Sequence, residues 1–236
     1  MNSENTLGVV GMSKEKGWQI ELRQSADWFI EDKTNRTVEA LKKNGFDSFH
    51  VPTRAAALER LLQLIPEGSR VGIAGSMTIR QIGLDDALRN RGDQVDDIWA
   101  KKYRMEEHLA IRKRHFDADV FLTGSNAITE DGKLVNIDGL GNRVAAMVFG
   151  PKKVIIVAGI NKIVKTVDDG IRRIREISAP MNVKRLGGKT PCTEKGCCDL
   201  NVCQPPDRHC HIITIVEKKP MKTDTTVVLV GENLGY

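Results

Sequence analysis

The sequence predicts an α/β fold: a mostly parallel Rossmann-like sheet with helices on both faces, an N-terminal helical extension, and a cysteine-rich loop before the last two strands. Short apolar segments alternate with amphipathic segments along most of the 236 residues, which is the pattern of strands connected by helices. Val, Ile and Leu number 57 against 11 aromatic residues, and an aliphatic interior is typical of buried parallel strands. All 5 cysteines lie within residues 192–210, outside this alternation.

The composition indicates a single domain over residues 1–236. A chain of this length buries a sizeable core without covalent cross-links, and no repeat or linker divides it. We distinguish an N-terminal extension, residues 1–45, and a cysteine-rich segment, residues 187–211. With 28% charged residues and no apolar stretch near the ~20 residues of a membrane helix, we expect no membrane insertion. The N-terminus lacks a signal-peptide pattern, so we expect a cytoplasmic protein with reduced thiols.

The first predicted element is a long amphipathic helix over residues 20–44. Leu22 and Phe29 recur on one face, and Leu41 continues that apolar stripe. Gly45 follows the last periodic residue, and glycine favours the left-handed conformation that ends a helix.

The elements that follow alternate between strand and helix. Thr53 and Thr166 are placed to cap helices, and Asp131-Gly132 between two apolar runs predicts a hairpin. The further helices are expected after Thr53, after Thr166, and over residues 78–90, 104–115 and 140–149. The strands are expected over residues 46–51, 71–74, 95–99, 120–123, 154–157, 212–216 and 226–230.

Candidate ligand-binding residues follow the predicted strands. Ligands of an open parallel sheet bind where its strands end, and these positions carry glycine beside serine, threonine or asparagine. Glycine lets the backbone approach a ligand, helix N-termini attract anions, and a basic side chain neutralises a phosphate or carboxylate. The candidates are Gly75, Ser76, Thr78, Gly124, Ser125, Asn126, Asn136, Gly139, Asn142, Arg143, Asn161 and Lys162.

The alternative interpretation of these loops is structural. Ordinary strand-to-helix turns and helix caps use the same residue types. Neither the GxGxxG fingerprint nor the GxxxxGK[ST] phosphate loop occurs, so no motif supports NAD or ATP binding. The loops predict a small anionic substrate without identifying it.

Two carboxylates near the predicted hairpin, Glu130 and Asp138, are the candidate catalytic residues. A carboxylate serves as a general base or as an acyl-accepting nucleophile. Their structural alternatives are a solvated turn residue for Glu130 and a helix cap for Asp138. No GxSxG motif occurs, which disfavours a serine hydrolase.

Three segments together resemble the lactate-utilisation, or LUD, domain family. They are GSMTIRQIGL (75–84), TGSNAITEDGKLVNIDGLGNRVAAMVFGPKKVIIVAGINKIV (123–164) and the late PC…GCC…C…PDRHC segment. The resemblance implies the fold of CoA transferases, ribose-5-phosphate isomerase and glucosamine-phosphate deaminase, a group that binds acyl-CoA or phosphosugars at these loops. It also implies a role in oxidising L-lactate to pyruvate beside iron–sulfur partner subunits.

The cysteine-rich segment is a candidate metal site. The resemblance matches the cysteines usual in the family to Cys192, Cys198, Cys203 and Cys210, and it leaves Cys197 as an extra. Four thiolates this close in sequence are able to bind one zinc ion or one iron–sulfur cluster, although no CxxC pair occurs. The alternative is a loop of free or reversibly oxidised thiols.

The formal charge of +5 comes from basic pairs and triplets that are spread along the chain. Nucleic-acid-binding proteins concentrate such charge and interleave it with aromatic residues. We therefore interpret these groups, Arg112–Arg114 among them, as solvated surface and expect no nucleic-acid partner. Two functions remain: an enzyme or subunit of lactate oxidation that uses the strand-end loops, and a non-catalytic redox or assembly subunit that uses the cysteines.

Overall fold

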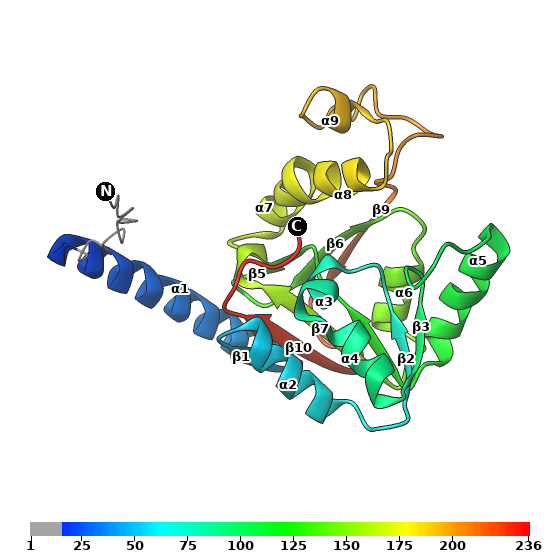
Figure 1. Ribbon diagram of the computed structural model, residues 1–236. Helices are drawn as coiled ribbons and strands as arrows, with labels where there is room; N and C mark the ends of the chain where they lie inside the picture. The colour runs from blue at the N-terminus through cyan, green and yellow to red at the C-terminus, as the bar shows by residue number, and fades with distance from the viewer. Residues whose placement is uncertain (1–15) are drawn as a thin grey trace, which may run out of the picture.

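A six-stranded parallel sheet forms the centre of the computed structural model, which describes residues 16–236 (Figure 1). The expectations about the N-terminal residues 1–15 lie outside the described residues. From one edge to the other the strands are β1 (Asp47–Val51), β10 (Asp224–Val230), β7 (Lys153–Gly159), β4 (Val120–Thr123), β2 (Arg70–Ile73) and β3 (Gln94–Asp97). The predicted α/β class with a mostly parallel sheet is confirmed.

A second, four-stranded sheet packs against the first. Its order is β8 (Ile163–Val164), β5 (Ala127–Thr129), β6 (Leu134–Asp138) and β9 (Ile212–Val216). β5 and β6 pair antiparallel around Gly132, which confirms the predicted hairpin. The last two predicted strands exist, but β9 joins this small sheet and β10 joins the large one.

Helices connect most of the strands. They are α1 (Gly17–Lys43), α2 (Arg54–Leu64), α3 (Met77–Ile82), α4 (Leu84–Arg91), α5 (Met105–Arg114), α6 (Asn142–Val148), α7 (Val167–Arg173), α8 (Ala179–Arg185) and α9 (Pro191–Glu194). The single helix expected over residues 78–90 is two helices, because Gly83 adopts a left-handed conformation with φ 77° and ends α3. Within residues 16–236, no helix is long and apolar enough to cross a membrane.

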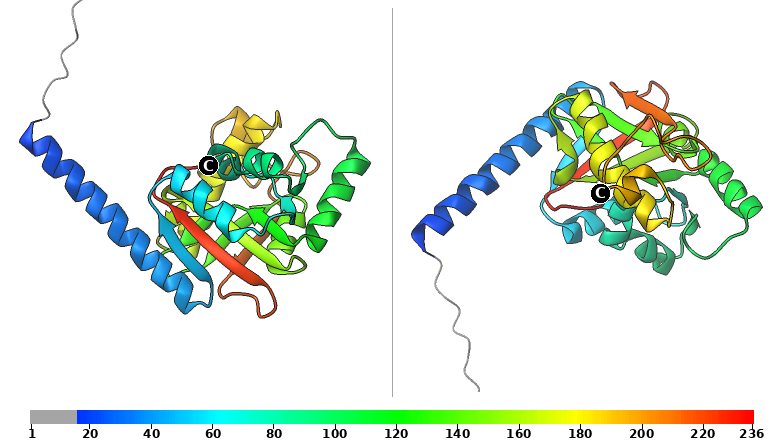
Figure 2. Two further views of the ribbon diagram at one scale, coloured as in Figure 1. Left: turned by 60° about the horizontal axis from the view of Figure 1, so that its bottom comes forward. Right: turned by 90° about the horizontal axis from the view of Figure 1, so that it is seen from above.

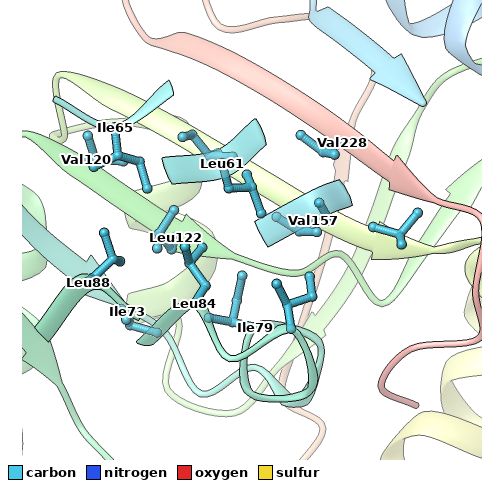
Figure 3. Close-up of a cluster of buried hydrophobic side chains, with 14 of the residues drawn as sticks. Leu61, Ile65, Ile73, Ile79, Leu84, Leu88, Val120, Leu122, Val157 and Val228 are labelled. Atoms are coloured by element: carbon cyan, nitrogen blue, oxygen red, sulfur yellow. The ribbon is translucent and has the colours of Figure 1, made fainter. Parts of the chain in front are cut away.

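Helices α2, α3 and α4 cover one face of the large sheet (Figure 3). Leu61, Ile79 and Leu88 from these helices pack on Leu122 and Val157 of the strands, and all five side chains are buried. The opposite face packs against α6, the end of α1 and the small sheet. The sheet is therefore buried on both faces, as the aliphatic composition indicates.

The first half of α1 projects from the body of the molecule (Figure 2). Leu22 and Phe29 of the predicted apolar stripe are exposed, whereas Val38 and Leu41 are buried near the hairpin. The helix itself is confirmed, but only its second half packs against this chain.

Helices α7 and α8 are joined by a π-helical segment, Ile174–Ser178. Pro180 follows it and has no N–H to donate to a carbonyl one turn earlier, which accounts for the wider turn. The continuous helix passes over the small sheet, beside the place where several strands end (Figure 1).

Candidate functional site

A cavity of about 300 Å³ lies at the carboxyl ends of the strands. Its floor is formed by the loops after β2 and β4, which are neighbours in the sheet. In the sheet, β3 lies on one side of β2 and β4 lies on the other side, so the chain reverses its direction across the sheet between β3 and β4. Crevices that bind ligands in α/β proteins occur at such reversals of strand order.

Two glycines allow this close packing. A Cβ added at Gly75 would lie 2.5 Å from the Trp99 ring, so glycine lets the indole cover the loop after β2. A Cβ added at Gly124 would lie 3.2 Å from Ser76 Oγ and 3.7 Å from Lys162 Nζ. The two loops and the lysine therefore enclose one small space.

Arg143 holds the site together from α6. Its Nη1 donates to Asn136 Oδ1 at 2.8 Å, and its Nη2 donates to Asn126 Oδ1 at 3.1 Å. Its Nε lies 3.3 Å from Asp138 Oδ2. Burial lowers the pKa of Arg143, and the adjacent Asp138 carboxylate opposes that shift. The guanidinium is thus a fixed positive charge that connects α6 to the β4–β5 loop and to β6.

Lys162 supplies a second buried cationic group directly after β7. Its side chain is 5% exposed and donates from Nζ to Thr78 Oγ1 at 2.9 Å. It makes no ion pair with any carboxylate of the described residues. Burial, together with the charges of the nearby Arg173 and Arg143, lowers its pKa to about 7.

Of the twelve predicted ligand-binding residues, three lie behind the cavity rather than on it. Thr78 accepts from Lys162, Asn136 accepts from Arg143, and Asn161 Oδ1 accepts from the Leu234 N–H. Thr78 and Asn136 orient residues that line the cavity, and Asn161 holds the backbone next to Gly235, which also lines it. The nine that line it are Gly75, Ser76, Gly124, Ser125, Asn126, Gly139, Asn142, Arg143 and Lys162.

The two candidate catalytic carboxylates lie in different places. Asp138 lines the cavity, and its Oδ2 accepts no well-aligned hydrogen bond within the described residues. Glu130 is in the hairpin turn, 3.3 Å from Arg36 of α1, and does not line the cavity. Of the pair, only Asp138 is placed to contact a ligand there.

Sequence reasoning missed several residues of this cavity. Arg112, interpreted from the sequence as solvated surface, is half-buried and lines the cavity. Burial lowers the Arg112 pKa, the charge of Asp138 opposes that shift, and Arg112 makes no ion pair with the described residues. Trp99 and Arg185 also line the cavity, with the guanidinium 4.3 Å from the ring centroid. The strand-end rule missed Trp99 because the predicted strand, residues 95–99, includes it, whereas β3 ends at Asp97.

The cysteine-rich segment reaches the cavity through His209 and Cys210. Burial raises the pKa of Cys210 to about 11, with further contributions from the charges of Cys198, Cys192 and Cys203. The predicted four thiols are therefore neighbours, while Cys197 is exposed.

All five thiols are free. Within residues 16–236, no three His, Cys, Asp or Glu side chains converge closely enough to hold a metal ion. As placed here, the thiols do not form a metal site.

Comparison with known proteins gives the family. A search of curated proteins found no match. A crystal structure of a DUF162 family protein from Deinococcus radiodurans is similar with a TM-score of 0.50 and 14% identity, over 85% of this chain and 98% of that one, and shows the fold alone. A crystal structure of eIF2B delta from Chaetomium thermophilum aligns at a TM-score of 0.34 and 13% identity, over 65% of this chain and 59% of that one, which is too distant to carry an argument. The sequence profile of the LUD domain matches residues 34–230, and the chain belongs to the LUD domain family.

Proposed function

We propose that the cavity binds a small carboxylate, a 2-hydroxy or 2-oxo acid, in the lactate utilisation that the family name denotes. The observation that carries this proposal is the pair Lys162 and Arg112, which line the cavity without an ion pair of their own. Lys162 is buried and Arg112 is half-buried, and removing a cation from water without a paired counter-charge is costly. An anionic ligand supplies the missing charge.

The charge of the whole lining supports an anion. The residues that line it include four with basic side chains, Arg112, Arg143, Lys162 and Arg185, and one with an acidic side chain, Asp138. Arg143 is committed to the loops, so Arg112 and Lys162 are the groups left to bind the ligand. A guanidinium recognises a carboxylate through two parallel hydrogen bonds.

A ligand that binds only the folded state raises the unfolding temperature by mass action. We would therefore measure thermal unfolding with L-lactate, pyruvate, inorganic phosphate, a sugar phosphate and a CoA ester. Lactamide, which has the shape of lactate without its charge, is the matched control. Stabilisation by lactate or pyruvate and not by lactamide supports the proposal. Equal stabilisation by lactamide, or none by any acid, contradicts it.

In this proposal Asp138 is the residue for proton transfer, since it is the acidic side chain among the residues that line the cavity. The two electrons of lactate oxidation would pass to iron–sulfur partner subunits. Replacing Asp138 with Asn removes the base and leaves the size of the side chain. We expect lactate to bind and partner-reconstituted oxidation to be lost. Glu130 was also predicted as catalytic, but it does not line the cavity, so the structure adds no support to a catalytic role for it.

A second candidate role is non-catalytic and uses Cys192, Cys198, Cys203 and Cys210. It is favoured by the proximity of these thiols and by Cys210 at the cavity. Binding of zinc or an iron–sulfur cluster requires the thiols to move closer together than they are here. Metal analysis after anaerobic purification tests it. The role is supported if the native chain and the control Cys197→Ser contain metal and Cys198→Ser does not. It is contradicted if the native chain contains no metal.

A further inference from the structure

The position of Lys162 at the cavity suggests a role beyond balancing the charge of a ligand. It ends the turn that follows the central strand β7, and its amine lies on the cavity floor beside two glycines. A Cβ added at Gly235 would lie 3.0 Å from Nζ, and one added at Gly124 would lie 3.7 Å from it. Because both residues are glycines, no side chain occupies the space beside the buried amine where these residues line the cavity.

The surroundings of the amine favour its neutral form. Its one hydrogen bond is donated to the Thr78 hydroxyl, and the charged groups nearest to it are the guanidinium groups of Arg143 and Arg173. Burial and these like charges bring its pKa to about 7. A neutral amine has a lone pair, and desolvated lysines of this kind act as nucleophiles toward carbonyl carbon.

We propose that Lys162 forms a reversible imine with the keto carbon of a 2-oxo acid whose carboxylate is held by Arg112. The inference rests on the proposed anion site and goes beyond it by assigning a covalent bond to one amine. It distinguishes 2-oxo acids from 2-hydroxy acids, because only the former carry a carbonyl.

The step balances without an oxidant or reductant. The Nζ lone pair adds to the keto carbon and forms a C–N bond, while the carbonyl oxygen takes up a proton. That proton replaces one of the two that the amine gives up, so the carbinolamine nitrogen carries one N–H. The carbinolamine then loses its hydroxyl group as water together with this second amine proton, and a C=N bond forms. Asp138, which faces the same cavity, is the carboxyl group placed to exchange these protons.

The test traps the imine by reduction. The full chain is incubated with pyruvate and sodium cyanoborohydride, and the modified lysine is located by mass spectrometry of peptides. L-lactate replaces pyruvate in a parallel sample, because it cannot form an imine. Pyruvate binding is measured separately by calorimetry. Lys162→Met and the exposed neighbour Lys165→Met form a matched pair.

We expect one reduced pyruvyl group on Lys162 in the native chain and in Lys165→Met, and none in Lys162→Met or with lactate. Pyruvate that binds without being trapped, or that modifies surface lysines equally, overturns the imine and leaves the anion site intact. Absence of pyruvate binding overturns the imine, and absence of binding by both pyruvate and lactate overturns the anion site as well.

Discussion

Replacing Lys162 with Met tests how the buried amine titrates. Met preserves the length of the side chain and removes its charge. The pKa of Lys162 is lowered from 10.5 to about 7 in the folded chain, whereas the unfolded chain keeps the ordinary value. Between these two values the unfolded chain binds the extra proton, so the free energy of unfolding of the native chain rises with pH.

The magnitude follows from that shift. Each pH unit between the two pKa values contributes up to about 1.4 kcal/mol. Half of the amine is already neutral at about pH 7, so the rise from about pH 7 to about pH 9 is roughly 2 kcal/mol. Lys162→Met lacks this dependence. We therefore subtract the free energy of unfolding of the native chain from that of Lys162→Met at each pH. This difference is expected to be larger at pH 7 than at pH 9 by roughly 2 kcal/mol.

Urea unfolding at both pH values, with reductant and constant ionic strength, measures the difference. The exposed Lys165→Met is the control and should follow the native chain at both pH values. If the native chain and Lys162→Met differ by the same free energy at pH 7 and pH 9, the lysine titrates normally and the reasoning about its burial fails.

Three further predictions concern the packing and the charge of the site. Gly132→Ala is expected to lower the free energy of unfolding by at least about 1–3 kcal/mol, because φ is 83° and the new Cβ would lie 2.6 Å from the Ala40 carbonyl carbon; urea unfolding measures it. Gly75→Ala is expected to displace the Trp99 ring, 2.5 Å from the new Cβ, and to weaken ligand binding in a calorimeter. Lactate binding near pH 8 is expected to take up a proton, since an anion favours the charged form of Lys162; calorimetry in buffers of different ionisation enthalpy measures this uptake.

These predictions have controls within the chain. Gly17→Ala introduces a Cβ with nothing within 4 Å, so neither stability nor binding should fall. Unchanged stability of Gly132→Ala, or unchanged affinity of Gly75→Ala, contradicts the close contacts described for them. Proton uptake that persists in Lys162→Met assigns the titration to another group.

The local sequence determined most of the fold and part of the site. The elements were predictable because apolar periodicity and turn residues act over a few neighbours, as at Asp131-Gly132. The strand-end rule identified nine residues that line the cavity, because parallel strands place their ends at one edge of the sheet. The partition of β9 and β10 into separate sheets was not predictable, since it depends on long-range pairing.

Arg112 shows what local patterns leave out. It lies on a highly charged helix, where nothing in its spacing separates it from its exposed neighbour Lys113. Its partial burial depends on where α5 lies in three dimensions. The proximity of Cys192 to Cys210 was likewise not predictable from local patterns, because it depends on how the loop folds and not on the spacing of the cysteines in the sequence.

The central claim, that a small carboxylate binds to the unpaired cations of the cavity, is tested most directly by calorimetric titration of pyruvate into three proteins: the native chain, Arg112→Gln and Lys113→Gln. Loss of one charged hydrogen-bonding partner costs roughly 1.5–3 kcal/mol, which corresponds to an affinity weaker by about tenfold or more. We predict one site per native chain, that loss for Arg112→Gln, and native affinity for Lys113→Gln. Equal affinity of all three proteins, or equal loss in both variants, would contradict the assignment of this cavity as the binding site.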